Sequence, residues 1–197
     1  MIPMVIGSII GLGIVLEKFY LFYKIRIDIP KFTKEIFACI REDNVNRAMR
    51  MCNTTYHPLA SLFKVGIQHR KDSKDKLNER LEKRADYEIR GLERHLGILV
   101  TIVSVAPMLG FLGTIIGLIR AFMAWEQMGN NITVSALAGG IYQAMITTAA
   151  GLSIAIPYYI CYNYIVDRIK DIAVTLSNCG DDIINSLIEL QEKKYEG

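Results

Sequence analysis

Among the polar residues within long apolar stretches, three threonines and one glutamine invite a chemical interpretation: Thr114, Thr147, Thr148 and Gln143. Ser104, Ser153 and Asn163 add further polar groups. A threonine in a helix can bond to a carbonyl one turn back, so a single one signals little. Together the four predict a polar seam or lumen among apolar helices. None of them titrates in a useful range, whereas a proton relay through a bilayer needs Asp, Glu or His. If this chain serves a proton path, another chain must supply the carboxylate.

Other chemistry finds no support in the sequence. An intramembrane enzyme would need a Ser–Lys, His–Glu or paired-Asp set inside the apolar stretches, and no such set is present. The four cysteines have no paired spacing and form no zinc-type pattern with the three histidines. We therefore expect no catalytic residue, no metal, no cofactor and no disulfide.

Three apolar stretches predict three membrane-spanning helices. Residues 96–119 and 127–166 contain no Asp, Glu, Lys or Arg, and each exceeds the roughly 20 residues needed to cross a bilayer. Two buried helices of a soluble protein this long would dominate a chain of 197 residues. Residues 2–23 form the first span rather than a signal peptide, because no basic segment precedes them and no small-residue cleavage site follows.

Charge asymmetry predicts the topology. Seventeen Lys and Arg residues lie between Lys24 and Arg94 and four more follow Asp167, whereas the turn between the long apolar stretches carries only Glu126. By the positive-inside rule the basic parts and the C-terminus are cytoplasmic, and the N-terminus lies outside. The basic loop lacks the aromatic-interleaved stripe of a nucleic-acid site. The expected segments are a first span at 1–23, a cytoplasmic helical domain at 24–95, a second span at 96–124, a periplasmic turn at 125–132, a third span at 133–166 and a cytoplasmic tail at 167–197.

The cytoplasmic parts have helical periodicity. Apolar residues in 28–70 recur at helical spacing and predict short amphipathic helices. Capping residues at Asp72 and Ser73 precede a periodic run without a Gly–Pro break, which predicts one continuous helix over about 74–124. The tail from Asp167 continues as a helix that Gly180 could interrupt. These projections are expected to form a helical bundle below the membrane.

Small residues recur on one side of each long span, where they would allow close helix packing, either within one chain or between subunits. The packing set comprises Gly110, Gly113 and Gly117 in the second span and Gly140, Ala144 and Gly151 in the third. Pro107 and Pro157 also lie within the spans, where a proline removes a backbone hydrogen bond and shapes the helix. Three spans cannot give every such face an internal partner, which favours self-association.

These segments resemble the MotA/TolQ/ExbB proton channel family, and in particular its three-span ExbB/TolQ branch. The resemblance lies in APMLGFLGTIIGLIRAF at 106–122, in AMITTAAGLSIAIPYYICYN at 144–163 and in AMRMCNTTYHPLASLFKVGI at 48–67. Glu17 and Lys18, which face the cytoplasmic mouth or pair there, resemble a Glu–Arg element of the family. The resemblance covers nearly the full chain.

The resemblance implies an all-α membrane protein that forms a homo-oligomeric ring, typically a pentamer, in a bacterial inner membrane. One or two single-span ExbD/TolR-like chains would occupy the lumen and supply a membrane aspartate. Proton flow would then drive an outer-membrane process such as TonB-dependent import, with a TonB/TolA-like protein as a further partner. Thr114 and Thr148 fall on the lumen-facing threonines of the family, and Thr147 is a neighbouring candidate.

One departure from the family concerns Gln143, which stands where well-studied relatives have Glu, five residues before Thr148. An amide can bond but cannot hold a charge, so the function of that carboxylate is expected to be absent or relocated. Two other interpretations stay open: a non-conducting membrane scaffold, and a MotA-like flagellar stator subunit, although such chains usually have four spans.

Overall fold

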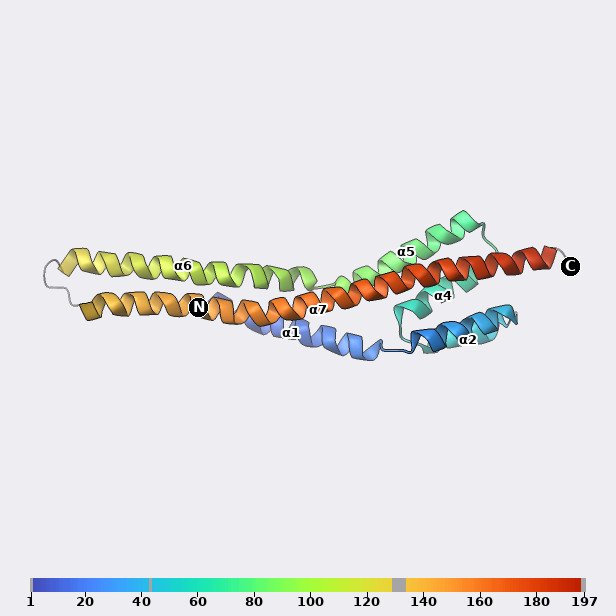
Figure 1. Cartoon of the computed structure of the whole chain (residues 1–197), viewed down its shortest axis with the longest axis horizontal. Coiled ribbons are helices and arrows are strands. Elements are labelled where there is room, and N and C mark those ends of the chain that lie inside the picture. The colour runs from blue at the N-terminus through green and yellow to red at the C-terminus, as the bar shows by residue number, and fades with distance from the viewer. Residues whose placement is uncertain (1, 43, 129–133, 196–197) are drawn as a thin grey trace. The chain divides into compact units, whose positions relative to one another are not determined.

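The computed structural model describes residues 2–42, 44–128 and 134–195, and within these residues all regular structure is helical (Figure 1). The helices are α1 (Ile2–Lys24), α2 (Ile29–Arg41), α3 (Val45–Thr54), α4 (Pro58–Gln68), α5 (Lys74–Glu93), α6 (Leu96–Met128) and α7 (Val134–Tyr195). This confirms the predicted all-α fold. Of the expected turn at 125–132, residues 125–128 belong to α6 and residues 129–132 lie outside the described part of the chain.

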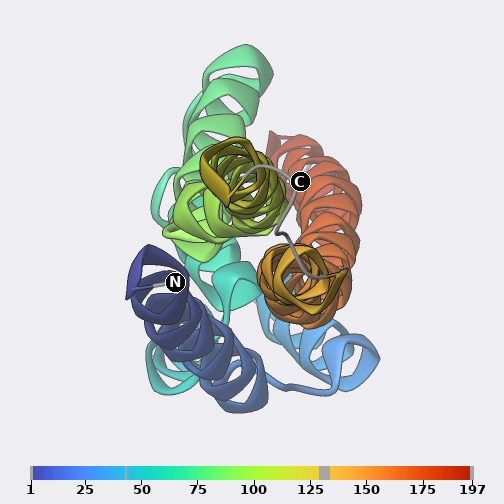
Figure 2. The same cartoon turned by 90° about the vertical axis from the view of Figure 1, so that its left-hand side faces the viewer.

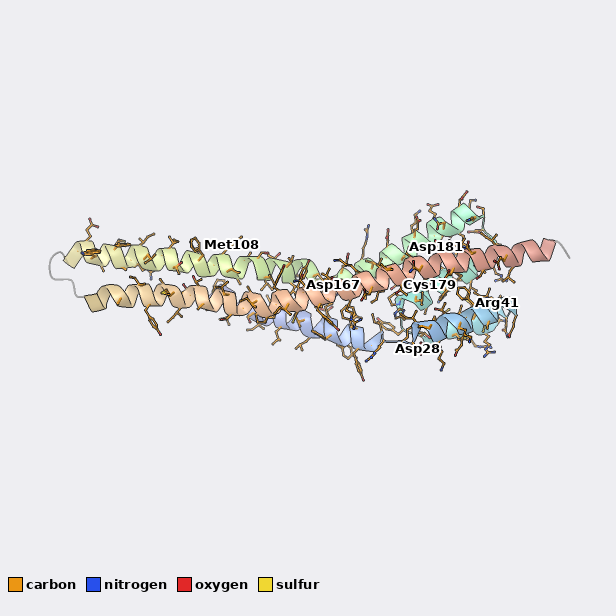
Figure 3. All side chains as sticks on the ribbon, viewed as in Figure 1. Asp28, Arg41, Met108, Asp167, Cys179 and Asp181 are labelled. Carbon is orange, nitrogen blue, oxygen red and sulfur yellow. The ribbon has the colours of Figure 1, made fainter. Side chains whose placement is uncertain are left out.

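Three helices among the described residues are long and apolar enough to cross a membrane: Ile2–Lys24, Leu96–Gln127 and Ala138–Leu190. Their large apolar side chains are mostly exposed, as expected for helices whose outer surface contacts lipid rather than water. Met108, for example, is 68% exposed and extends away from α6 (Figure 3). The prediction of three spanning helices is confirmed.

The chain divides into two compact units, and each has its own packing. The first unit comprises Met1–Lys18 and His95–Ile165, and the second comprises Phe19–Arg94 and Val166–Gly197. In the first unit, α6 and the early part of α7 run side by side in opposite directions (Figures 1 and 2). The first unit therefore holds the apolar helices on which the sequence places its candidate site.

The second unit has a hydrophobic core centred on α4. Phe63 is fully buried there, with its ring 6.1 Å from that of Phe32 and 5.7 Å from that of Phe37. Leu81 from α5 and Leu176 from α7 complete the same core. Local capping supports the short helices, since Asp28 accepts a bond from the Lys31 amide at the start of α2. The predicted amphipathic helices of residues 28–70 are confirmed as α2, α3 and α4.

The continuous helix predicted over 74–124 is wrong. The structure ends α5 at Glu93 and begins α6 at Leu96, because His95 adopts a left-handed backbone conformation with φ 68°. A right-handed helix cannot pass through such a residue. The opposite correction applies to Gly180, which does not interrupt α7. Ser73 does precede α5, but its hydroxyl makes no capping bond.

Candidate functional site

Small residues bring α6 and α7 into contact at backbone distance within one chain. A Cβ built on Gly110 would lie 2.9 Å from the Thr147 carbonyl oxygen, and one on Gly151 would lie 2.6 Å from the Ala106 carbonyl oxygen. Gly117 faces Ala144, and Gly140 faces Ala121, each with a built Cβ 2.7 Å from the alanine Cβ. Any larger side chain at these glycines would force the two helices apart. The small faces of the two long spans are thus partners of each other.

Two of the candidate threonines lie in this contact. The Thr148 hydroxyl donates to the Gly110 carbonyl oxygen across the helix pair at 3.0 Å. The Thr147 hydroxyl donates to the Ala144 carbonyl oxygen of its own helix at 2.7 Å and lies 3.3 Å from the Gly110 carbonyl oxygen. Gly113 provides the space for Thr147, because a Cβ there would lie 2.5 Å from Oγ1. Both hydroxyls are half-buried and retain their lone pairs for an external donor.

Thr114 follows Gly110 by one helical turn, so it lies on the same side of α6 as the contact. Its hydroxyl donates to the Phe111 carbonyl oxygen at 2.5 Å, and the side chain is half-buried. Gln143 lies one turn before Thr147 on α7, and its amide is exposed. Hydrocarbon cannot satisfy an exposed amide. This side of the helix pair therefore requires water or another chain.

The prolines of the sequence-based set lie within continuous helices. Pro107 belongs to α6 and Pro157 to α7, and both helices extend well beyond them in each direction. Pro107 is half-buried and directly follows Ala106, the residue that faces Gly151. Pro157 is exposed. The two prolines thus flank the helix contact without ending either helix.

A hydrogen bond that sequence reasoning missed joins α1 to α7. The Tyr158 hydroxyl donates to the Ser8 carbonyl oxygen at 2.6 Å and lies 3.2 Å from the Ser8 hydroxyl. A Cβ on Gly11 would lie 3.3 Å from the Tyr158 ring, so the glycine makes room for it. The signals were present in the sequence, because a tyrosine within a span needs a polar partner and Gly7 and Gly11 have the spacing of close-packing membrane helices.

Glu17 and Lys18, the residues of the expected cytoplasmic mouth, lie near the end of α1. The Glu17 carboxylate lies 3.0 Å from Nδ1 of His95, the residue at which α5 and α6 separate. Lys18 is buried, with 1% of its side chain exposed. Glu17 thus contacts His95, and Lys18 is buried in the same turn of α1. His95 was not singled out from the sequence, because a positive φ is uncommon for any residue other than glycine.

The described residues contain no group of three or more His, Cys, Asp or Glu side chains that could hold a metal ion. The candidate residues of the two long spans offer hydroxyls, carbonyls and the exposed amide of Gln143. Such groups can bond to water, to a cation or to a protonated acid, but they cannot themselves carry charge across the apolar stretch.

Comparison with known proteins identifies the family. The model of the MotA/TolQ/ExbB proton channel family matches residues 54–178, which include α4, α5, α6 and the apolar part of α7. The chain belongs to this family. It is therefore a multi-pass membrane protein of a proton channel family rather than of an enzyme family.

Relatives place the chain in the ExbB/TolQ branch. An ExbB homolog from Methanothermobacter thermautotrophicus is 32% identical over 165 residues, which cover 83% of this chain and 58% of the relative. TolQ of the Tol-Pal system from Haemophilus influenzae is 37% identical over 100 residues, or 51% of this chain and 43% of TolQ. The biopolymer transport protein ExbB from Salmonella typhimurium is 29% identical over 119 residues, or 60% of this chain and 48% of that protein. The chain thus matches about half of the length of these curated relatives.

Proposed function

We propose that this chain is the channel subunit of a motor driven by the proton motive force, and that it works with a single-span partner of the ExbD/TolR type. The chain would form a homo-oligomeric ring, as a pentamer, around the partner's membrane helix. The partner would supply the aspartate that takes up and releases the ion. The motor would power an outer-membrane process such as TonB-dependent import, with a TonB/TolA-like protein as the receiver.

One observation carries the proposal. The chain belongs to a proton channel family and has hydroxyls at the close contact of its two long spans, but these spans contain no acidic, basic or histidine side chain at their centre. Residues 96–119 and 127–166 contain no Asp, Glu, Lys or Arg, and the three histidines lie outside them. A proton cannot be held there by this chain alone. An acid from a second chain satisfies this requirement directly.

Thr114 and Thr148 would line the ion path beside that acid, with Thr147 and Gln143 as neighbours. The hydrogen of Thr148 is directed to Gly110, which leaves oxygen lone pairs to accept from a protonated carboxyl or from water. The exposed amide of Gln143 supports the same assignment, because a ring lumen would offer it water or a polar partner.

The close helix contact also weighs against a passive scaffold. A scaffold would use its small-residue faces to bind other membrane proteins. In this chain Gly110, Gly117, Gly140 and Gly151 are all occupied by contacts within the chain. We further propose that the protein resides in a bacterial inner membrane, with residues 24–95 and the tail in the cytoplasm and the N-terminus in the periplasm, as its charge asymmetry favours.

The test removes single hydroxyls from the proposed path. The chain is purified with a candidate single-span partner of the ExbD/TolR type and reconstituted into vesicles, and ion uptake is measured under an imposed gradient. Thr148→Val and Thr114→Val are expected to abolish uptake, while Thr148→Ser retains part of it. Thr101→Val is the matched control, because Thr101 is an exposed α6 threonine that bonds only to its own helix at Gly97.

Assembly is measured in the same samples by native mass spectrometry, so that loss of the ring is distinguished from loss of transport. Uptake at the normal rate in both valine variants would remove the two threonines from the path. Full uptake by the chain without any partner would contradict the proposal of a second-chain acid. Repeating the assay with a sodium gradient and no proton gradient identifies the ion.

A further inference from the structure

The second unit contains a cavity of about 410 Å³ that the proposed function does not use. Small-molecule sites commonly measure about 300–1,000 Å³. Most of the lining comes from α3, α4 and the segment between them, within the stretch 48–67. Residues 48–67 resemble the family, but none of them has a role in the proposed function. Their side chains give the cavity a polar and positively charged wall.

The charged residues of the lining carry a net positive charge. Lys64 and Arg84 are the two cations and Glu88 is the one anion. Arg84 donates through Nε to the Ser61 hydroxyl at 2.7 Å and through Nη2 to Glu88 at 2.6 Å. These bonds hold the guanidinium rigidly and leave its Nη1 donors for a ligand. A further cation contacts one of the lining residues, since the Lys24 ammonium lies 4.3 Å from the centre of the Tyr56 ring.

A histidine adds a neutral donor to the same wall. Nδ1 of His57 accepts a bond from the Leu59 amide at 3.0 Å, at the first turn of α4. Burial lowers the pKa of His57 to about 4, so the ring is neutral at ordinary pH. Its hydrogen must then be on Nε2. The start of α4 therefore offers a fixed N–H group and the positive end of a helix dipole to the cavity.

The remaining wall is apolar and belongs to the membrane boundary. Leu21 lies within the candidate span Ile2–Lys24, and Ile25 directly follows it. Leu92 lies four residues before Leu96, where the next candidate span begins. One side of the cavity is thus formed by apolar residues that lie within or next to candidate spans in the sequence, while the other side presents cations.

From this arrangement we infer that the cavity binds the phosphate headgroup of an anionic phospholipid. The phosphodiester would lie between Lys64 and Arg84, and the glycerol and first acyl carbons would contact Leu21, Ile25 and Leu92. Basic side chains near a bilayer surface each contribute about 1 kcal/mol to binding an anionic lipid. A free phosphate shares the anionic chemistry but would leave the apolar wall unused.

The test uses the full chain, purified in a non-denaturing detergent and titrated with phosphatidylglycerol or with phosphatidylcholine. Retained lipid is counted by native mass spectrometry. The wild type is expected to retain phosphatidylglycerol in preference to phosphatidylcholine. Lys64→Gln should lower the affinity for phosphatidylglycerol about fivefold, which corresponds to about 1 kcal/mol of binding free energy. The double variant Lys64→Gln with Arg84→Gln should lower this affinity further. Lys64→Arg should restore binding, which separates loss of charge from loss of fold.

The matched control is Lys71→Gln with Lys76→Gln, which removes two exposed positive charges of the same unit from outside the cavity. This variant should bind like the wild type. Equal retention of phosphatidylcholine, unchanged binding in the cavity variants, or displacement of phosphatidylglycerol by inorganic phosphate would each overturn the lipid assignment. So would failure of a water-soluble maleimide to reach Asn53→Cys in the lipid-free oligomer, because another chain would then fill the cavity.

Discussion

Replacing Gly110 by alanine is expected to separate α6 from α7 and to destabilise the first unit. The added Cβ would lie 2.9 Å from the Thr147 carbonyl oxygen and 3.0 Å from the Thr148 Cα, whereas ordinary contact begins near 3.4 Å. The neighbours are backbone atoms, so the helices must move apart by about 0.5 Å. Overpacking of this kind costs about 1–3 kcal/mol. Alanine offsets about 0.5–1 kcal/mol of this by its helix propensity, which leaves a net loss of about 1 kcal/mol in the middle of a range of roughly 0–2.5 kcal/mol.

The measurement is the unfolding midpoint of the purified chain, followed by circular dichroism as dodecyl sulfate is titrated into a mild detergent. Gly13→Ala is the control, because Gly13 is also in mid-helix and a Cβ there would meet nothing within 4 Å. That variant should be as stable as the wild type or slightly more stable. If the Gly110→Ala and Gly13→Ala variants have the same unfolding midpoint in dodecyl sulfate, the close contact of α6 with α7 does not exist in the protein.

Three further predictions follow from single contacts and use the same unfolding assay. Tyr158→Phe should lower the free energy of unfolding by about 1 kcal/mol, because it removes the 2.6 Å hydrogen bond to the Ser8 carbonyl oxygen. Tyr159→Phe should have little effect, because Tyr159 is 54% exposed. The pKa of His57 is lowered from 6.5 to about 4 by burial, so the unfolded chain binds the proton first. The free energy of unfolding should therefore fall as the pH drops from 6.5 to 4, by up to about 3 kcal/mol, and His57→Asn should flatten that part of the profile. His95→Val should cost at least about 1 kcal/mol, because a β-branched residue tolerates φ 68° poorly, and His95→Asn should be nearly neutral.

Most of the fold could be predicted from the sequence, because each helix has a periodic signal of its own. The charge-free stretches indicated the long spans, and the apolar spacing in residues 28–70 indicated the short helices. The separation of α5 from α6 could not be found in this way. The apolar pattern continues across it, and the residue that adopts the positive φ is His95 rather than the glycine or asparagine that would mark such a position.

The types of residue at the candidate site could also be predicted, but their partners could not. Threonines and glycines at helical spacing are visible in the sequence. That Thr148 bonds to the Gly110 carbonyl depends on the register of two helices whose residues are 38 positions apart. The bond from Tyr158 to Ser8 spans 150 positions and depends on how α1 meets α7. The spacing of residues within one helix does not tell which residues of a second helix will lie opposite them.

The intimate contact of α6 with α7 has a mechanical consequence. At Gly110, Gly117, Gly140 and Gly151 there is no spare volume, so a shift of one helix along the other by a fraction of a turn would press atoms of the two helices together, and a shift by a whole turn would break the bond from Thr148 to the Gly110 carbonyl. We therefore expect the pair to tilt or turn as one element. In the proposed motor, the part that changes position would then be the partner chain or the whole subunit, and not one of these two helices moving past the other.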